Sequence, residues 1–441
     1  MEIVVNQKIR LNPAASDGCP PLDGDVLKYD WAQLDRDVLE CIFKRLDFID
    51  LCRTKTVCPW WTKTFAYTFK KLHACPALPW LVFPPQEDND HLCRGFKTGR
   101  FWDFEDDKFY PFNNIAAENY CFIGSSHGWL VCLDKQVVPF LSNPFTFEKI
   151  QLPPLGSLLG ISGFERTANG QYEIGLRMPD ETRFIRTLRE RFVRKAVLSS
   201  CPSHRHKYYA VLIYGPELRL AFYKDGDSSW TELVGGHKPY EPYEDIICNQ
   251  KQIYALTSNA ELDVWDIIPD GLPIKKMYIE NDIWRTLDHI YLGNLCTRYY
   301  LVESAGNLLL VIRTIIMYLK DADDDGESND TKMTCYTTLT FNVFKLDTKK
   351  KLWIEIGSLG DRALFVGRNE SISIEIKDCK SFKQDSIYFS DDFWASLEAD
   401  HLRGQPDIGL FCFEDREIQW RYECETENIG RPSTWVVPHP W

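Results

Sequence analysis

The sequence lacks a hydrophobic run long enough to cross a membrane. Its most apolar stretch, residues 308–319 (LLLVIRTIIMYL), has 12 residues and contains Arg313. A membrane-spanning helix needs about 20 consecutive apolar residues, so this stretch predicts a strand of the protein core instead. The N-terminus, MEIVVNQKIRLNPAASDG, also lacks the basic and then apolar pattern of a secretory signal. We therefore expect no membrane partner.

The sequence also has no surplus of positive charge. Lys and Arg total 51 while Asp and Glu total 64, which gives a formal net charge of −13. Surfaces that bind nucleic acids or anionic membranes need a basic footprint, so no nucleic acid partner is expected. One basic run extends from Arg183 to Lys195. It predicts a solvated face or loop, with an anion or partner site as the alternative.

The cysteines do not follow the pattern of a disulfide scaffold. There are 15 of them, an odd number, and their spacing does not repeat. A secreted scaffold of this size would usually pair its cysteines, so the sequence predicts reduced and mostly buried thiols. Since no targeting segment is recognisable either, we expect a cytoplasmic or nuclear protein.

Motifs that carry catalysis or bind metals are missing too. The chain has no G-x-S-x-G, no phosphate-binding loop and no H-E-x-x-H, so no catalytic residues are predicted. Cys201, His204 and His206 lie close together, but no second ligand pair follows, as a structural zinc site would require. Residues 321–326 (DADDDG) match half of a calcium loop, but Lys332 stands where the glutamate should be. We expect a solvated acidic insertion there, and no cofactor.

What the chain does contain divides into three parts. Residues 1–28 mix polar residues with Gly and Pro and predict a flexible tail. Residues 29–75 predict a small helical domain. Residues 76–441 have a different pattern, in which short apolar runs alternate with Gly, Asn, Asp and Pro, as is typical of strands separated by turns.

Three short helices are expected in the second part. Asp35 is the expected N-cap of the first helix, in which apolar residues recur every three or four positions. Asp50 is expected to cap a second helix through Val57. Pro59 interrupts the stretch TVCPWW, and it fits best at the first position of a third helix, where its missing N–H costs nothing.

The third part contains a degenerate repeat. Its copies share a strand, a polar turn, in several cases a tryptophan, and an alternating strand, and another apolar strand precedes several of them. Recurrence at intervals of about 40 or 80 residues predicts a mainly β fold, a β-propeller of about six blades, with five or seven as alternatives. Trp230, Trp353 and Trp420 take equivalent places and predict packing between blades. The copies span residues 100–112, 137–156, 218–236, 260–279, 341–360 and 408–423.

Both structured parts resemble known families. YDWAQLDRDVLECIFKRLDFIDLCRTKTVCPWW resembles an F-box, with its I-x-x-R-L, D-L and V-C-x-x-W elements in order. GSSHGWLVCLD, LSNPFTFEKIQLPPL and SLGDRALFVGRNESISI resemble the large plant family of F-box proteins with a kelch-like propeller. The resemblance covers nearly the whole chain. It implies a kelch-like β-propeller preceded by a small three-helix F-box domain.

The resemblance also implies a function. F-box proteins are non-catalytic substrate receptors of SCF-type cullin–RING ubiquitin ligases. Their F-box docks on a Skp-type adaptor, and through it on cullin, while the second domain holds a protein substrate. Asp35 replaces the usual proline of the family, Pro59 replaces a basic residue, and Trp60 is additional. The adaptor-facing positions carried over are Leu34, Val38, Ile42, Leu46, Leu51, Val57, Cys58 and Trp61.

Two other functions stay open on the sequence. Aromatic richness and fold analogy allow a propeller that binds or cleaves carbohydrate, because the plentiful carboxylates could include a glycosidase pair. Loss of the proline at position 35 allows a scaffold that no longer binds an adaptor. Trp60, which has no counterpart in the F-box pattern, is expected to pack against the segment that leads into the propeller.

Overall fold

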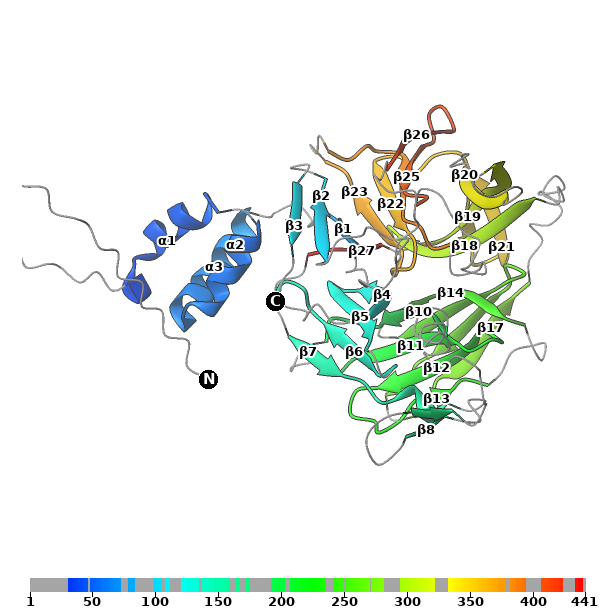
Figure 1. Ribbon diagram of the computed structural model, residues 1–441, viewed down its shortest axis with the longest axis horizontal. Helices are drawn as coiled ribbons and strands as arrows, with labels where there is room; N and C mark the ends of the chain where they lie inside the picture. Colours follow the sequence, from blue (N-terminus) through cyan, green and yellow to red (C-terminus); the bar gives the residue numbers. More distant parts are fainter. Residues whose placement is uncertain are drawn as a thin grey trace, which may run out of the picture.

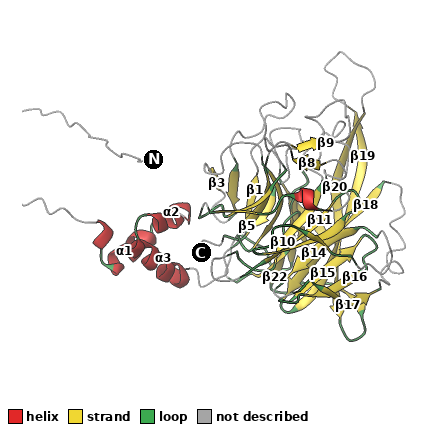
Figure 2. Cartoon of the chain, turned by 90° about the horizontal axis from the view of Figure 1, so that it is seen from below, coloured by secondary structure: helices red, strands yellow, loops and turns green. Residues whose placement is uncertain are grey.

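The computed structural model places a small helical domain beside a ring of β-sheets (Figure 1). Figure 2 shows the N-terminal helices gathered on one side of the strand-built body. The structure describes residues 31–46, 48–72, 78–83, 99–104, 108–111, 120–134, 137–146, 148–158, 164–166, 172–174, 192–202, 207–234, 241–249, 251–269, 271–280, 294–321, 332–377, 381–393, 406–422 and 433–438. The predicted domain boundaries lie outside these ranges and stay predictions.

Two predicted helix starts are confirmed. Helix α1 (Arg36–Phe43) begins directly after Asp35, although the Asp35 side chain makes no capping hydrogen bond. Helix α3 (Pro59–Leu72) begins at Pro59. A proline there is favourable because the first N–H groups of a helix have no intrahelical partner and its fixed φ already suits the helix.

The second helix differs from the prediction. Helix α2 (Phe48–Arg53) begins before Asp50 and is continued by a 3₁₀ turn, η2 (Thr54–Thr56). Asp50 therefore lies within the first turn, where its carboxylate accepts a 2.7 Å hydrogen bond from Arg53. This local ion pair occupies the carboxylate that was expected to cap the helix.

The helical domain has its own small core. Leu39, Phe43, Leu51 and Phe65 are buried together. A second 3₁₀ turn, η1 (Trp31–Gln33), precedes α1. Because a core this small stabilises little by itself, contact with the rest of the chain matters for this domain.

The strands of the described residues form seven sheets, and six of these are the blades of a six-bladed β-propeller. Blade 1 contains β1 (Trp80–Phe83), β2 (Arg100–Asp103), β3 (Lys108–Pro111) and β27 (Thr434–Val436), and blade 2 contains β4 (Cys121–Ser126), β5 (Trp129–Leu133), β6 (Pro139–Ser142) and β7 (Lys149–Gln151). Blade 3 contains β10 (Val193–Leu198), β11 (Tyr209–Tyr214), β12 (Arg219–Lys224) and β13 (Thr231–Glu232).

The remaining blades follow in chain order. Blade 4 contains β14 (Tyr243–Cys248), β15 (Gln252–Thr257), β16 (Leu262–Asp266) and β17 (Ile274–Ile279), and blade 5 contains β18 (Leu295–Ser304), β19 (Asn307–Asp321), β20 (Lys332–Asp347) and β21 (Leu352–Ile356). Blade 6 contains β22 (Arg362–Val366), β23 (Ile372–Glu375), β24 (Ser386–Phe389), β25 (Gly409–Cys412) and β26 (Glu417–Arg421). A 3₁₀ turn (η3, Leu155–Ser157) and a separate pair, β8 (Phe164–Arg166) and β9 (Tyr172–Ile174), lie between blades 2 and 3 in the chain.

The predicted repeat is confirmed as the outer hairpins of the blades. Residues 218–236 contain β12 and β13, and residues 341–360 contain the end of β20 together with β21. The other four copies contain the corresponding outer pairs of blades 1, 2, 4 and 6. The run 308–319 lies in β19 as predicted, although its end is exposed, with Leu319 at 63%.

Tryptophan packing between blades is confirmed where the side chains are described. Trp230 is buried among residues of blades 2 and 3, and its Nε1 donates a 2.7 Å hydrogen bond to the carbonyl of Pro153. Trp353 is half-buried against the cluster between blades 4 and 5. The side chain of Trp420 lies outside the described residues.

The centre of the ring is formed by the inner strand of each blade. The inner strands β27, β4, β10, β14, β18 and β23 are neighbours in that order. The approach of β4 to β10 is close, because a Cβ on Gly124 would lie 2.1 Å from the carbonyl oxygen of Ala196. Blade 6 departs from the expected antiparallel pattern, since β22 and β24 run parallel.

Candidate functional site

The structure divides the eight predicted adaptor-facing residues by exposure. Val38 and Val57 are 46% and 54% exposed. Leu51 is only 3% exposed and belongs to the core of the helical domain. The half-buried members are Leu34, Ile42, Leu46, Cys58 and Trp61.

The two adjacent tryptophans attach α3 to the start of the domain. Trp61 donates a 2.8 Å hydrogen bond from Nε1 to the carbonyl of Trp31, and its ring packs edge-on against Phe43 at 5.6 Å. Trp60 donates from Nε1 to the carbonyl of Leu34 at 2.8 Å. The expectation that Trp60 packs toward the propeller is therefore wrong, because its indole is held by Leu34, which lies next to the N-cap residue of α1.

A different residue of the helical domain contacts the propeller. Cys52 in α2 is buried in one cluster with Trp80 and Phe145, which belong to blades 1 and 2. Lys55 follows in η2, and burial lowers its pKa, opposed by the charges of Cys52 and Glu148. The helical domain therefore rests on the propeller through α2 and η2.

A cavity of about 200 Å³ opens near the starts of the inner strands of blades 3, 4 and 5. We call it the inner-strand cavity. Charged side chains dominate its lining, together with the turn after β11 and the segment after β22. The cavity is lined by Arg194, Lys195, Gly215, Pro216, Leu218, Glu244, Asp245, Arg298, Tyr299, Tyr300, Gly367, Arg368 and Asp392.

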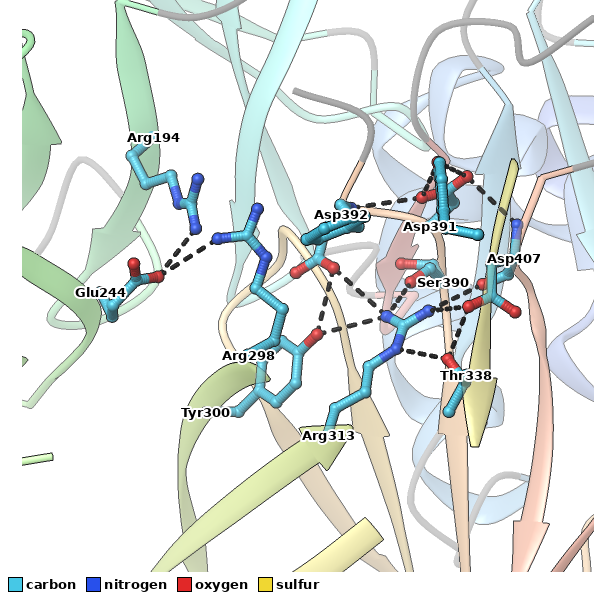
Figure 3. A network of polar contacts seen from close by, with 12 residues as sticks. Arg194, Glu244, Arg298, Tyr300, Arg313, Thr338, Ser390, Asp391, Asp392 and Asp407 are labelled. Carbon is cyan, nitrogen blue, oxygen red and sulfur yellow. Dashed lines mark hydrogen bonds and ion pairs between the residues drawn. The ribbon is translucent and has the colours of Figure 1, made fainter. Parts of the chain in front are cut away.

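Two arginines of this cavity share one carboxylate. Glu244 Oε2 accepts from Arg194 at 2.7 Å and from Arg298 at 3.3 Å (Figure 3). The Arg298 guanidinium also lies 5.2 Å from the centre of the Phe393 ring. Ion pairs in a half-buried position are screened less than surface pairs, so both guanidinium groups are held in place.

A second pair is fully buried beside the first. The Lys195 ammonium contacts Asp245, whose second oxygen accepts a 2.6 Å hydrogen bond from the Leu301 N–H. Burial raises the pKa of Asp245, although Lys195 opposes that shift. The predicted solvated face is thus wrong for Lys195, because β10 is an inner strand. Residues 183–191 of the basic run lie outside the described residues.

The segment after β22 crosses the centre and joins blade 6 to blades 2 and 3. Arg368 donates a 2.8 Å hydrogen bond to the carbonyl of Val193. The Glu370 N–H donates to Ser125, and the Glu370 carboxylate accepts from the Ser126 hydroxyl. Burial raises the pKa of Glu370 to about 7.

A buried network around Arg313 lies next to the cavity (Figure 3). The Arg313 side chain is 0% exposed and donates to Asp407 at 2.9 Å and to Asp392 at 3.2 Å. It also donates to Thr338 at 2.7 Å. Burial, with the charge of Asp407 beside it, raises the pKa of Asp391 to about 6. These contacts attach the long strands of blade 5 to blade 6.

Sequence reasoning found little of this cavity. Arg313 is visible as a charge within an apolar run, and its need for a buried partner could have been predicted, because a charge within an apolar strand must be paired. SLGDRALFVGRNE was noticed only as a family resemblance, and its Arg368 and Glu370 are the residues that cross the centre. Glu244 and Arg298 carry no local signal, since 54 positions separate them in the chain.

The described residues contain neither a metal-binding cluster nor a helix that could span a membrane. Within the described ranges, no group of His, Cys, Asp and Glu could hold a metal ion. His204, His206 and residues 322–331 lie outside those ranges. None of the ten cysteines that the structure describes forms a disulfide, and six of them are buried. None of the helices in the described part of the chain is long and apolar enough to cross a membrane.

Comparison with known proteins finds plant relatives that match most of the chain. A probable F-box protein of Arabidopsis thaliana is 24% identical over 427 residues, which cover 92% of this chain and 96% of the relative. Another F-box protein of that plant is 25% identical over 382 residues, covering 81% and 84% of the two chains. Among solved structures, the Nup133 β-propeller domain of Vanderwaltozyma polyspora is 7% identical, with a TM-score of 0.29, covering 81% of this chain and 97% of that chain.

Two family matches divide the chain as the structure does. Residues 31–61 match the F-box domain, which here contains η1, α1, α2, η2 and the start of α3. Residues 101–414 match the KIB1-4 β-propeller, from β2 to the turn after β25. The chain therefore belongs to the KIB1-4 β-propeller family and carries an F-box at the N-terminal side of its propeller.

Proposed function

We propose that this protein is a substrate-recognition subunit of an SCF-type cullin–RING ubiquitin ligase. The observation that supports this best is the F-box match at residues 31–61, followed by a propeller of a family whose relatives include F-box proteins. The F-box would bind a Skp-type adaptor, and through it cullin. The propeller would hold a protein substrate and would carry out no chemistry itself. We place this activity in the cytosol or the nucleus.

The exposed part of the F-box is where the adaptor would bind. Val38 and Ile42 lie one helical turn apart on α1, and Val57 is exposed before α3. Apolar anchors of this kind contribute most when they fill the centre of an interface. Leu51 would support that surface from within the core.

The departures from the F-box pattern are compatible with this role. Pro59 starts α3 without interrupting a helix, and Asp35 precedes α1 as its N-cap residue. Both residues are exposed. Neither substitution removes an apolar side chain from the core of the helical domain.

The proposal is tested by co-expression with a Skp-type adaptor of Arabidopsis thaliana, followed by size-exclusion chromatography and titration. The wild-type chain should co-elute with the adaptor. Val38→Asp together with Val57→Asp should weaken binding by about tenfold or more, because each change places a charge in an apolar contact. The matched control is Val234→Asp, at a valine of the propeller that is 80% exposed.

Circular dichroism should show the same fold for the wild-type chain and both variants. The proposal fails if the wild-type chain does not bind the adaptor. It also fails if the double variant binds as tightly as the Val234→Asp control.

A further inference from the structure

The inner-strand cavity has the features of a binding site that the F-box role alone does not explain. Its lining carries four basic side chains and three carboxylates, in a chain with a net charge of −13. It opens where inner strands of three blades begin, so it draws residues from β10, β14 and β18. Sites in propellers and barrels often lie where several such strand ends meet.

Two of the three carboxylates of the lining, Asp245 and Asp392, are turned toward cations and donors within the protein. Asp245 accepts from Lys195 and from the Leu301 N–H. Asp392 accepts from Arg313 and from the Tyr300 hydroxyl at 3.0 Å. These contacts direct negative charge into the protein, away from an incoming group.

The arginines are arranged differently. Arg194 and Arg298 come from two different blades and meet at one oxygen of Glu244. Their side chains are 19% and 6% exposed, so a ligand would contact them in a largely desolvated setting. A guanidinium group presents a planar fork of N–H donors that matches a carboxylate, and such contacts strengthen as water is excluded.

The size of the cavity limits its occupant. Its volume of about 200 Å³ is below the range of about 300–1,000 Å³ that is usual for small-molecule and cofactor sites. The cavity suits one inserted side chain or chain end of a larger partner. Tyr299, Pro216 and Leu218 would contact the aliphatic part of that group.

We propose that the inner-strand cavity binds a carboxylate of a peptide segment, held by Arg194 and Arg298. This inference rests on the proposed role as a substrate receptor and names the substrate class: a protein that presents an acidic side chain or its C-terminal carboxylate to the propeller. Because the carboxylate is the shared chemistry, the experiment separates its two sources.

The experiment selects peptides with the full-length chain, in complex with its adaptor where that complex forms. One displayed library contains the C-terminal segments of a plant proteome, and a second contains internal segments that end in a neutral amide. Selection in the first library identifies the terminal carboxylate, and selection in the second identifies an acidic side chain. Bound peptides are then resynthesised with the selected carboxylate replaced by an amide. Fluorescence polarisation should show binding weakened by about tenfold or more.

Variants of the chain connect the peptides to the cavity. Arg194→Ala and Arg298→Ala should each weaken binding by about tenfold, and Arg194→Lys should weaken it less, because the charge is kept and the fork is lost. Glu244→Gln should strengthen binding, since the amide oxygen still accepts from an arginine while a competing negative charge is gone. The matched control is Lys276→Ala, which removes a cation from the outermost strand β17.

The outcomes are distinct. If neither library yields peptides, or if binding requires no carboxylate, the inference is wrong. It is also wrong if Arg194→Ala, Arg298→Ala and Glu244→Gln leave binding at the Lys276→Ala level. A chain that binds its adaptor but selects no peptide contradicts this inference alone, whereas peptide binding without adaptor binding contradicts only the ligase role.

Discussion

Arg313 is the residue whose loss the propeller should tolerate least. Its guanidinium is completely buried and pairs with Asp392 and Asp407. Replacing it by methionine keeps the apolar stem and leaves these carboxylates without their cation. We expect Arg313→Met to lower the free energy of unfolding by about 3–5 kcal/mol, measured by urea denaturation.

The control for this change is an arginine of similar chemistry at the surface. Arg219 is 37% exposed and pairs with Glu217 and Glu232. Arg219→Met should cost at most about 1 kcal/mol, because exposed ion pairs contribute little. If Arg313→Met and Arg219→Met lower the free energy of unfolding by equal amounts, burial does not determine how much the Arg313 network stabilises the protein.

Glu370 should make stability depend on pH. Its pKa rises from 4.5 to about 7 on folding, so between these values the folded chain holds a proton that the unfolded chain has released. Stability from this group is therefore present below about pH 4.5 and is lost as the pH rises through about 7. Asp391, with a pKa of about 6, acts in the same direction.

Glu370→Gln isolates this contribution, because the amide oxygen can still accept from Ser126. The melting temperature of the variant relative to wild type should be higher at about pH 8 than at about pH 5.5. Differential scanning calorimetry at both pH values measures this. A constant difference would mean that Glu370 does not titrate in this range.

At the scale of elements, the helical domain separates core residues from surface residues. Leu51 of α2 is buried with Leu39 and Phe65. Leu51→Ala should destabilise the domain by about 2–5 kcal/mol, because it removes buried methyl groups and leaves a cavity. Hydrogen exchange of the α1 and α3 amides measures this locally, and it should rise.

Val57→Ala is the matched change at an exposed position of the same domain. Its effect on stability should stay within about 0.5 kcal/mol. If Leu51→Ala leaves exchange unchanged but abolishes adaptor binding, Leu51 contacts the adaptor directly and its burial in the free chain is not maintained in the complex.

The sequence predicted those elements whose signals are local. Pro59 starts α3 because the preference of proline for the first helical position needs no tertiary contact. The outer hairpins were recognisable because a turn and alternating strands lie within about 20 residues. Trp60 was misplaced because the direction of an indole depends on its partner, here the Leu34 carbonyl.

The inner strands were harder to predict for a physical reason. Strands such as β10 (VRKAVL) and β14 (YEDIIC) are surrounded by neighbouring strands and carry charged residues that are buried in pairs. Alternation of polar and apolar residues then no longer indicates which face is solvated. The charged residues of the inner-strand cavity come from these strands, so the cavity could not be assembled from the sequence.

At the scale of the whole molecule, closure of the ring depends on a strand of three residues. β27 pairs with β1, where Leu81 is opposite Trp435. The Trp435 side chain is 0% exposed and lies 5.2 Å from the Phe365 ring of blade 6. Its carbonyl accepts from Ser125 of blade 2. No local pattern predicts this closure, because the paired strands stand at opposite ends of the propeller sequence.

Because β27 joins blade 1 to blades 2 and 6, its removal should open the ring. Deleting residues 433–441 would expose the edge of β1 and remove the buried indole of Trp435, a loss of about 3–5 kcal/mol for the side chain alone. We expect the truncated chain to lose its cooperative near-ultraviolet melting transition and to be cleaved rapidly in limited proteolysis.

Deleting residues 1–28, predicted to be a flexible tail, is the control and should leave both measurements unchanged. A synthetic peptide of residues 433–441 added to the truncated chain should restore part of the protection, since the β1 edge it pairs with is still present. A truncated chain that melts like the full chain would mean that the propeller is held closed by contacts other than β27.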